Sequence, residues 1–588
     1  MKRPATTRLA LSLALCSVAT IRLASATDAE GTPEPGSAPS PGDRGMMLTA
    51  IAGGTIEEVP LTYLGVQRDL AGPGYDVHLV RLEGPVGERI GVAAGMSGSP
   101  VYFGGELLGA LAYRFGALPR EAVGGVTPID DILGADRARP SAAAGPGDTL
   151  VTPIATPVQI SGLTGAVRRW LEPQLDELGF MVVAGGEGAP GDDAATPLVP
   201  GAPVGVALVR GDLSIAATGT VTYVDRDTVY AFGHPFLGSG SVEMPMVAVD
   251  VVHTLADLAG SVKMTRVRGQ MGAIVEDRLT AIVGRFGLEA RMIPLELVVR
   301  GGDYGDQRFD FELARSPVLS PILAAVSVAN ALSANVGYRQ QATMLARGEI
   351  VIRGMPRLPI EVAATSGVGA DPAIGVAAAV QQVLGTLWIN PFSEVELDKL
   401  ALEVRVDAEV RSYRVDDLHY DRGLLRPGQN LTVECVLRKY RGETVSRSFE
   451  IHVPDDLPAD ANLALVVGSP TEVDRALGRP LARRYGSVED VRAVIDILAD
   501  LRAANRLTAV LYRSSPGVVS RGAAYSDLPP SAERLMTASP GTPSSRNTTV
   551  SELFRTEVEL DGPVEGGVVV RLRVDSDLSD GIEAEDRP

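Results

Sequence analysis

Residues 95–100 read GMSGSP, and they are followed by a short apolar run at 101–103, a glycine pair at 104–105 and a second apolar run at 107–111. The two apolar runs predict a pair of strands joined by a glycine turn. A nucleophilic serine needs an exposed Oγ and backbone N–H groups that face a developing oxyanion. Glycines on both sides of Ser97 suit this requirement, although a simple hairpin loop explains the same pattern equally well.

The composition around this motif favours β structure. The chain has 588 residues, of which 45% are hydrophobic and only 5% aromatic, with 65 glycines and 41 prolines. Such a chain is too long for one core and predicts several domains, mainly β with a few helices. The formal charge of −19, with no basic stripe, excludes nucleic acid as an expected partner.

The N-terminus has the pattern of a secretory signal. Lys2, Arg3 and Arg8 precede an apolar run at 9–21, and an Ala-Ser-Ala sequence ends at Ala26. We expect cleavage after Ala26 and a secreted or periplasmic protein. The apolar run is shorter than the ~20 residues of a membrane span, so we expect no stable span after cleavage.

Cofactor chemistry has no motif in this sequence. No paired cysteine motif, HExxH or phosphate-binding glycine loop is present, and neither a metal nor a cofactor is expected. After signal cleavage Cys435 is the only cysteine, which excludes an intramolecular disulfide. Its alternating strand-like surroundings predict a small buried hydrophobic residue.

Of the five histidines, His234 is the best candidate for a general base. It follows a strand-like run and lies between a glycine and a proline, where the backbone holds the side chain. His253 lies in an apolar stretch and is predicted to be a core residue. The remaining three are interpreted as strand-face or solvent residues: His78, His419 and His452.

Composition shifts divide the chain into nine predicted segments. They are a signal peptide (1–26), a disordered leader (27–45), a serine-bearing barrel (46–138), a linker and helix (139–203), a histidine-bearing barrel (204–315), a helical segment (316–390), a β-sandwich (391–470), a second helical segment (471–522), and a low-complexity linker, strand pair and acidic tail (523–588).

Two segments carry a resemblance to a known family. Residues 95–110, from the GMSGSP motif through the glycine turn, closely resemble the serine motif of the SpoIVB (stage IV sporulation protein B) peptidases. Residues 219–223 with 231–234 resemble that family's histidine segment. The resemblance covers roughly residues 46–300. It implies a chymotrypsin-like pair of β-barrels, with Ser97 as nucleophile, His234 as base, and the N–H groups of Gly95 and Ser97 as oxyanion donors.

The order of the two segments departs from the family. The family has its histidine segment first, whereas Ser97 here precedes His234, so the expected double barrel is permuted. The third member of a triad therefore cannot be placed by position. Asp76 is preferred because it opens a strand after a Pro-Gly turn, and the alternatives are Glu83, Glu243 and Asp250.

Two functions follow from these expectations. The first is a secreted or periplasmic serine endopeptidase that acts on a protein or peptide substrate. The second is a non-catalytic envelope scaffold or binding protein that retains the peptidase fold.

Overall fold

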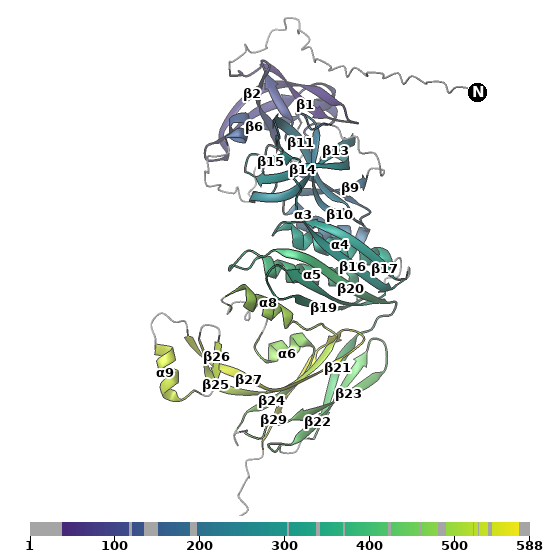
Figure 1. Ribbon diagram of the computed structural model, residues 1–588, viewed down its shortest axis with the longest axis vertical. Helices are drawn as coiled ribbons and strands as arrows, with labels where there is room; N and C mark the ends of the chain where they lie inside the picture. Colours follow the sequence, from purple (N-terminus) through teal and green to yellow (C-terminus); the bar gives the residue numbers. More distant parts are fainter. Residues whose placement is uncertain are drawn as a thin grey trace, which may run out of the picture.

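A computed structural model describes most of the chain and shows that it is mainly β, as predicted. The description covers residues 38–116, 120–134, 151–187, 197–302, 305–336, 341–367, 371–421, 425–457, 461–479, 488, 490–520, 523–526, 528–538 and 544–574. The predicted signal peptide lies outside these residues. Figure 1 shows the described elements stacked in three layers along the longest axis, with the N-terminal strands at one end.

The first layer begins with a closed six-stranded antiparallel barrel. Its strands pair in the order β4-β1-β2-β3-β6-β5, and a β4–β5 pairing closes the ring. These strands are β1 (Arg44–Ala50), β2 (Ile56–Gly72), β3 (Tyr75–Leu82), β4 (Pro100–Phe103), β5 (Glu106–Phe115) and β6 (Val123–Pro128), with β7 (Val151–Pro153), α1 (Gly84–Arg89) and α2 (Ile129–Leu133) beside them. Alternate side chains such as Val59, Leu61 and Val80 fill its interior.

A second ring of six antiparallel strands lies against the first. The pairings run β10-β11-β12-β15-β14-β13 and return to β10. The strands are β10 (Pro203–Gly211), β11 (Ile215–Asp225), β12 (Thr228–Ala231), β13 (Gly240–Leu255), β14 (Val262–Asp277) and β15 (Ile282–Phe286). Counted along the chain, both rings follow the order first-second-third-sixth-fifth-fourth. The segment predicted as a linker adds β8 (Thr156–Ser161), α3 (Gly165–Asp176) and β9 (Phe180–Glu187), which pair with or cover this ring.

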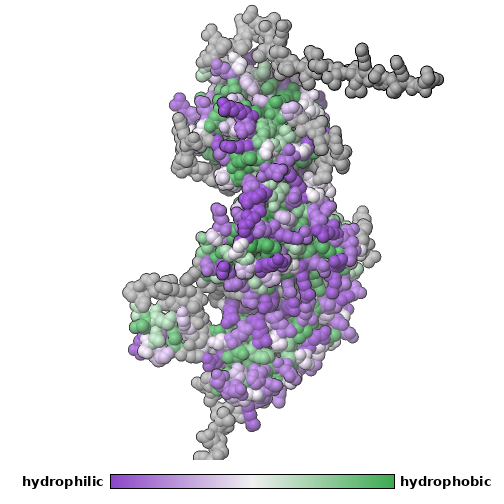
Figure 2. Space-filling model, viewed as in Figure 1, coloured by the Kyte–Doolittle hydropathy of each residue, from purple (hydrophilic) through white to green (hydrophobic). Residues whose placement is uncertain are grey.

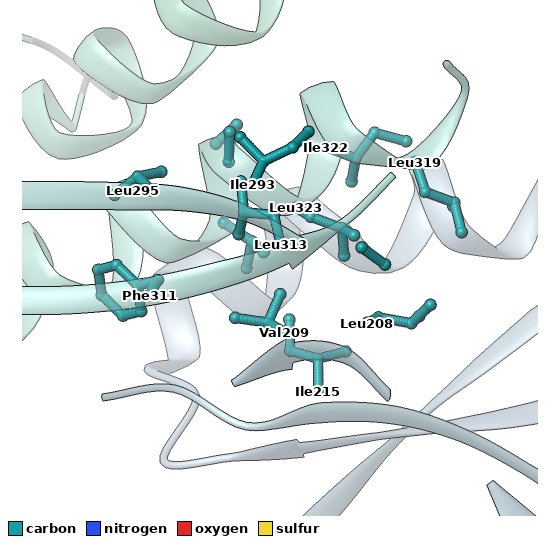
Figure 3. Close-up of a cluster of buried hydrophobic side chains, with 14 of the residues drawn as sticks. Leu208, Val209, Ile215, Ile293, Leu295, Phe311, Leu313, Leu319, Ile322 and Leu323 are labelled. Atoms are coloured by element: carbon teal, nitrogen blue, oxygen red, sulfur yellow. The ribbon is translucent and has the colours of Figure 1, made fainter. Parts of the chain in front are cut away.

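The middle layer is a five-stranded continuation of the same sheet backed by two helices. It contains β16 (Met292–Gly301), β17 (Gln307–Ala314), β18 (Thr343–Ile352), β19 (Leu358–Thr365) and β20 (Leu397–Asp407), with α4 (Leu319–Val336) and α5 (Pro372–Trp388). Figure 3 shows α4 side chains directed toward β16 and β17, with Leu208, Val209 and Ile215 of the second ring below. One core therefore connects this layer to the barrel.

The middle layer departs from the predicted segments in two ways. Strands β16 and β17 lie in the segment predicted as part of the histidine-bearing barrel, but they pair with β20 and β10 and pack against α4. Strands β18 and β19 lie within the segment predicted as helical. Their alternation of buried and exposed residues is interrupted, as at residues 347–349, so the period of two is weak in the sequence.

The third layer is a β-sandwich that extends beyond residues 391–470. One sheet contains β21 (Tyr413–Tyr420), β22 (Asn430–Lys439), β23 (Thr444–His452) and β28 (Val564–Glu565), and the other contains β24 (Leu463–Gly468), β25 (Arg506–Ser520), β26 (Ala523–Ser526), β27 (Ser544–Glu559) and β29 (Gly567–Leu572). The helices here are α6 (Pro470–Ala476), α8 (Val491–Ala499) and α9 (Pro530–Ala538). Strand β25 therefore lies in the segment 471–522 that was predicted as helical, and β26 and the start of β27 lie in the part of 523–588 that was predicted as a low-complexity linker.

The sandwich core places Cys435 as predicted. The residue is fully buried between the two sheets, and burial raises the pKa of its thiol to about 12. Figure 2 shows a mainly hydrophilic face over the middle and lower layers. Within the described chain, no helix is both long and apolar enough to cross a membrane.

Candidate active site

The Ser97 loop lies immediately before β4 and is shaped by two glycines. Gly95 has a φ of +90° and Gly98 a φ of +93°, which are conformations that side chains rarely adopt. A Cβ at Gly98 would lie 2.0 Å from the Thr220 carbonyl oxygen and 2.5 Å from the Phe232 nitrogen. The loop is thus pressed against β11 and the end of β12, in the second barrel. Ser97 itself is fully buried, and its Oγ makes no hydrogen bond to a described residue.

His234 lies just after β12 and is also buried. Phe232 and Gly233 both have positive φ values, which turn the chain sharply at the strand end. The His234 Nδ1 lies 2.8 Å from the Pro235 carbonyl oxygen, which can only accept, so Nδ1 carries the hydrogen. The Nε2 of the neutral ring then holds a lone pair, and it has no partner among the described residues.

Burial dominates the electrostatics of this ring. It lowers the pKa of His234 below the ordinary histidine value, against the opposing effects of the Pro235 carbonyl and the Asp277 charge. The imidazole is therefore neutral at neutral pH, which is the form required of a general base.

The structure brings the serine and histidine segments into contact across the two barrels. The Thr220 amide donates to the Ser97 carbonyl oxygen (2.8 Å), and the Thr222 hydroxyl donates to the Gly98 carbonyl oxygen (2.8 Å). From the other side, the Thr127 hydroxyl of β6 donates to the Gly233 carbonyl oxygen (2.7 Å). No hydrogen bond joins Ser97 Oγ to His234 Nε2, so each of these two atoms is without a partner among the described residues.

The two amides expected to serve as oxyanion donors are free within the described chain. The neighbouring N–H groups are used: Met96 donates to Ala93 O (3.0 Å), Gly98 to Leu111 O (2.8 Å) and Ser99 to Met96 O (3.0 Å). Those of Gly95 and Ser97 donate to no described residue. Backbone amides without a partner, beside a serine, are what an oxyanion hole requires.

None of the four predicted acids is hydrogen-bonded to His234. Asp76 accepts from the Asp69 amide (3.0 Å) and lies near His78 instead. The other three carboxylates have partners of their own, namely Thr62 and Arg81 for Glu83, Arg291 for Glu243, and Arg268 for Asp250. The assignment of Asp76 therefore finds no support in the geometry, because Asp76 lies in the first barrel on the same strand as His78, whose charge it affects.

Asp277 is the carboxylate that the structure places at the histidine loop. It is buried at the end of β14, and its oxygens accept from the amides of Phe236 (2.8 Å), Leu237 (2.8 Å) and Ser239 (3.0 Å). Three charge-assisted hydrogen bonds hold the turn that follows His234. Sequence reasoning missed Asp277, because no local sequence motif distinguishes a carboxylate that holds a distant turn from any other carboxylate at a strand end.

The remaining histidines lie away from this site. His78 is half-buried and bonded to the Tyr63 hydroxyl (2.9 Å), while His419 and His452 are exposed in the sandwich, as interpreted from the sequence. The prediction of a core position for His253 is wrong. A register shift in β13 between Val251 and His253 leaves that side chain facing solvent.

A buried lysine was also missed. Lys263 of β14 is 1% exposed, and its Nζ lies 2.8 Å from Thr49 Oγ1 and 3.3 Å from Thr220 Oγ1. Burial lowers the pKa of its amine to about 7. Its side-chain methylenes lie beside Gly95, where an added Cβ would be 3.2–3.4 Å from them.

Other features give no further site. A surface cavity of about 160 Å³ lies between residues 87–92 and 257–261, beside the segment that leads into the serine loop, but Ser97 does not line it. No cluster of His, Cys, Asp and Glu able to hold a metal occurs among the described residues. Comparisons with protein-family models, curated proteins and solved structures found no match to this chain.

Proposed function

We propose that the protein is a serine endopeptidase of SpoIVB type, with Ser97 as nucleophile and His234 as general base. The observation that carries the proposal is the pair of buried, unpartnered atoms, Ser97 Oγ and His234 Nε2, on loops that pack against each other. An unsatisfied buried polar group costs about 1–3 kcal/mol. Here one group is a hydroxyl donor and the other a nitrogen acceptor, in adjacent loops and beside two free amides. A catalytic role explains this arrangement best.

The barrel topology supports a permuted chymotrypsin-like arrangement. Both rings have the same strand order, and both loops join the third strand of a ring to its fourth: β3 to β4 for Ser97 and β12 to β13 for His234. Equivalent loops of two like barrels meet in the same way whichever barrel comes first in the chain. The reversed order of the two segments is therefore compatible with a working pair, because geometry defines the site.

In the proposed mechanism His234 Nε2 takes the proton of Ser97 as Oγ attacks a peptide carbonyl carbon. The resulting oxyanion is held by the amides of Gly95 and Ser97. The tetrahedral intermediate breaks its C–N bond, and His234 returns the proton to the leaving amine. Water, deprotonated by His234, then hydrolyses the Ser97 ester and restores the enzyme. Asp277 acts as a positioning residue by holding the turn after His234.

The burial of Ser97 makes the described state a closed one. Its side chain is 0% exposed, so the atoms that cover Oγ must move before a substrate carbonyl reaches it. A slow, opening-limited acylation is the expected consequence. The N-terminal sequence supports a secreted or periplasmic location, and Edman sequencing of exported protein should then begin at Thr27.

A non-catalytic scaffold is the second candidate, and the same burial favours it. Ser97 and His234 share no hydrogen bond, and Nδ1 of the histidine faces a backbone carbonyl rather than a carboxylate. In this function the loops serve only as packing between the barrels, and the sandwich would present the binding surface.

Labelling with a fluorophosphonate probe separates the two functions. We expect the unmodified protein to be labelled at Ser97, and Ser97→Ala and His234→Ala to abolish labelling. Ser241→Ala and His253→Ala change the same residue types at exposed positions of β13, and these control variants should label normally. A folded protein that resists the probe over many hours, at several temperatures, would exclude the peptidase and favour the scaffold.

A further inference from the structure

Lys263 lies at the centre of a hydrogen-bond network that reaches the serine loop. It belongs to β14 of the second barrel, yet it is bonded to Thr49 in β1 of the first barrel and to Thr220 in β11 of its own. No carboxylate accepts from it among the residues that the structure describes. Burying an amine that is paired only with hydroxyls is costly, and the proposed peptidase reaction does not use it.

The direction of these hydrogen bonds follows from the donors available. The Lys263 Nζ donates to the Thr49 and Thr220 hydroxyls, which keep their own hydrogens for other partners. The Thr220 hydroxyl donates to the Gly95 carbonyl oxygen (2.9 Å). Ser99 Oγ lies 2.7 Å from the Met96 carbonyl oxygen, which needs the serine hydrogen, and 2.9 Å from Thr49 Oγ1, which then donates to it.

Two chains of hydrogen bonds therefore run from one amine to the loop. One passes through Thr220 to the Gly95 carbonyl, and the other passes through Thr49 and Ser99 to the Met96 carbonyl. All of these side chains are buried. The backbone amide of Lys263 makes a third contact, because it donates to the Ala94 carbonyl oxygen (3.0 Å).

Two of these carbonyls belong to the peptide units that carry the oxyanion donors. The C=O and N–H of a trans peptide unit point in opposite directions. Holding the Ala94 carbonyl therefore aims the Gly95 N–H away from Lys263, and holding the Met96 carbonyl aims the Ser97 N–H away from Ser99. The Gly95 carbonyl belongs instead to the Gly95–Met96 peptide, whose N–H donates to Ala93.

We propose that Lys263 is the positioning residue of the oxyanion hole, orienting the Gly95 amide through its backbone and the Ser97 amide through Thr49 and Ser99. This role rests on the proposed peptidase function. The neighbouring chain through Thr220 reaches a peptide unit without an oxyanion donor, so it secures the loop but does not aim a catalytic amide.

The two threonines provide a matched pair of variants. Thr49→Val and Thr220→Val each remove one hydroxyl that accepts from Lys263, at sites of equal burial. We expect Thr49→Val to lower the maximal rate of fluorophosphonate labelling about 10-fold to 100-fold with the probe's half-saturating concentration unchanged. The expected fall in rate is smaller than the ~10²–10³-fold fall that follows complete removal of an oxyanion donor. It is smaller because the Ser99 amide still donates to the Met96 carbonyl oxygen.

The controls distinguish positioning from general loosening. Thr49→Ser keeps the hydroxyl and should restore the rate, Thr220→Val should label within about threefold of the unmodified protein, and Lys263→Met should behave like Thr49→Val. Equal losses in both valine variants would overturn the proposal. So would a crystal structure of Thr49→Val with full-rate labelling and the Met96–Ser97 peptide unmoved.

The failure of the proposed function gives a different result. If the unmodified protein is never labelled, the peptidase is excluded whatever the variants do. The crystal structures of Thr49→Val and Lys263→Met still decide the positioning role in that case, because a rotated Met96–Ser97 peptide supports it and an unchanged one contradicts it.

Discussion

Gly98 lies where the serine loop of the first barrel packs against the backbone of the second barrel, and Gly98→Ala tests that contact. The new methyl group would lie 2.0 Å from the Thr220 carbonyl oxygen, 2.5 Å from the Phe232 nitrogen and 3.0 Å from the Phe232 Cα. All three are backbone atoms of the second barrel, so no flexible side chain can move aside. The substitution must separate the serine loop from the histidine loop or distort both.

The loss of folding free energy expected for Gly98→Ala has two parts. A non-glycine residue with φ near +93° costs about 1–2 kcal/mol. Overpacking against fixed atoms adds about 1–3 kcal/mol. The total is therefore about 2–5 kcal/mol, and for a unit of 150–250 residues each kcal/mol lowers the melting temperature by about 2–4 °C. We expect the transition of the double barrel to fall by roughly 4–20 °C.

Gly105→Ala separates the two parts. Gly105 lies in the β4–β5 turn with a φ of +84°, and a Cβ there meets nothing within 4 Å. The variant should show only the cost of the backbone conformation, a fall in melting temperature of roughly 2–8 °C. Calorimetry of both variants measures the difference, and fluorophosphonate labelling reports whether the loops still meet. If Gly98→Ala is as mild as Gly105→Ala, the described contact between the barrels is wrong.

Three further predictions concern buried polar groups. Ser97→Ala should leave the free energy of unfolding unchanged or raise it by up to about 1 kcal/mol, because it removes an unpartnered hydroxyl; a loss above that size in urea denaturation would contradict this. Asp277→Asn should cost about 1–3 kcal/mol and reduce labelling, since an amide presents N–H groups to backbone donors; unchanged stability and labelling would remove Asp277 from the site. For Lys263 the folded pKa of about 7 lies below the ordinary 10.5, so between these values the unfolded chain binds a proton that the folded chain does not. The stability of the unmodified protein relative to Lys263→Met should therefore rise with pH from about 7 toward 10, by at most about 1.4 kcal/mol per pH unit, and a flat difference in denaturation across that range would refute the shift.

The sequence carried the parts of the candidate site that are encoded locally. Gly95 and Gly98 can adopt their positive φ values because glycine has no Cβ, and the β4–β5 hairpin follows from two apolar runs around a glycine pair. His234 was identified because a Gly-His-Pro turn after an apolar strand is visible within a few residues. The burial of Cys435 followed from strand alternation.

The charged groups around the site were not encoded in this way. Asp277 binds amides about 40 residues away, and Lys263 reaches Thr49 across 214 residues. Neither contact leaves a periodic or spaced pattern, because each depends on which strands become neighbours when the barrels close. Asp76 was preferred on local turn chemistry, and its strand then placed it beside His78.

The sequence by itself determined a mainly β chain, a serine loop and a histidine turn with the backbone freedom that chemistry needs, and a sandwich near the C-terminal end. These are consequences of glycine, strand period and turn residues, which act over short distances. Only the tertiary structure decided that the two loops meet, that Ser97 Oγ and His234 Nε2 are buried without partners, and that a lysine and an aspartate of β14 contact these loops. Burial and hydrogen-bond satisfaction are properties of the closed barrels, and strand pairing between distant segments sets them.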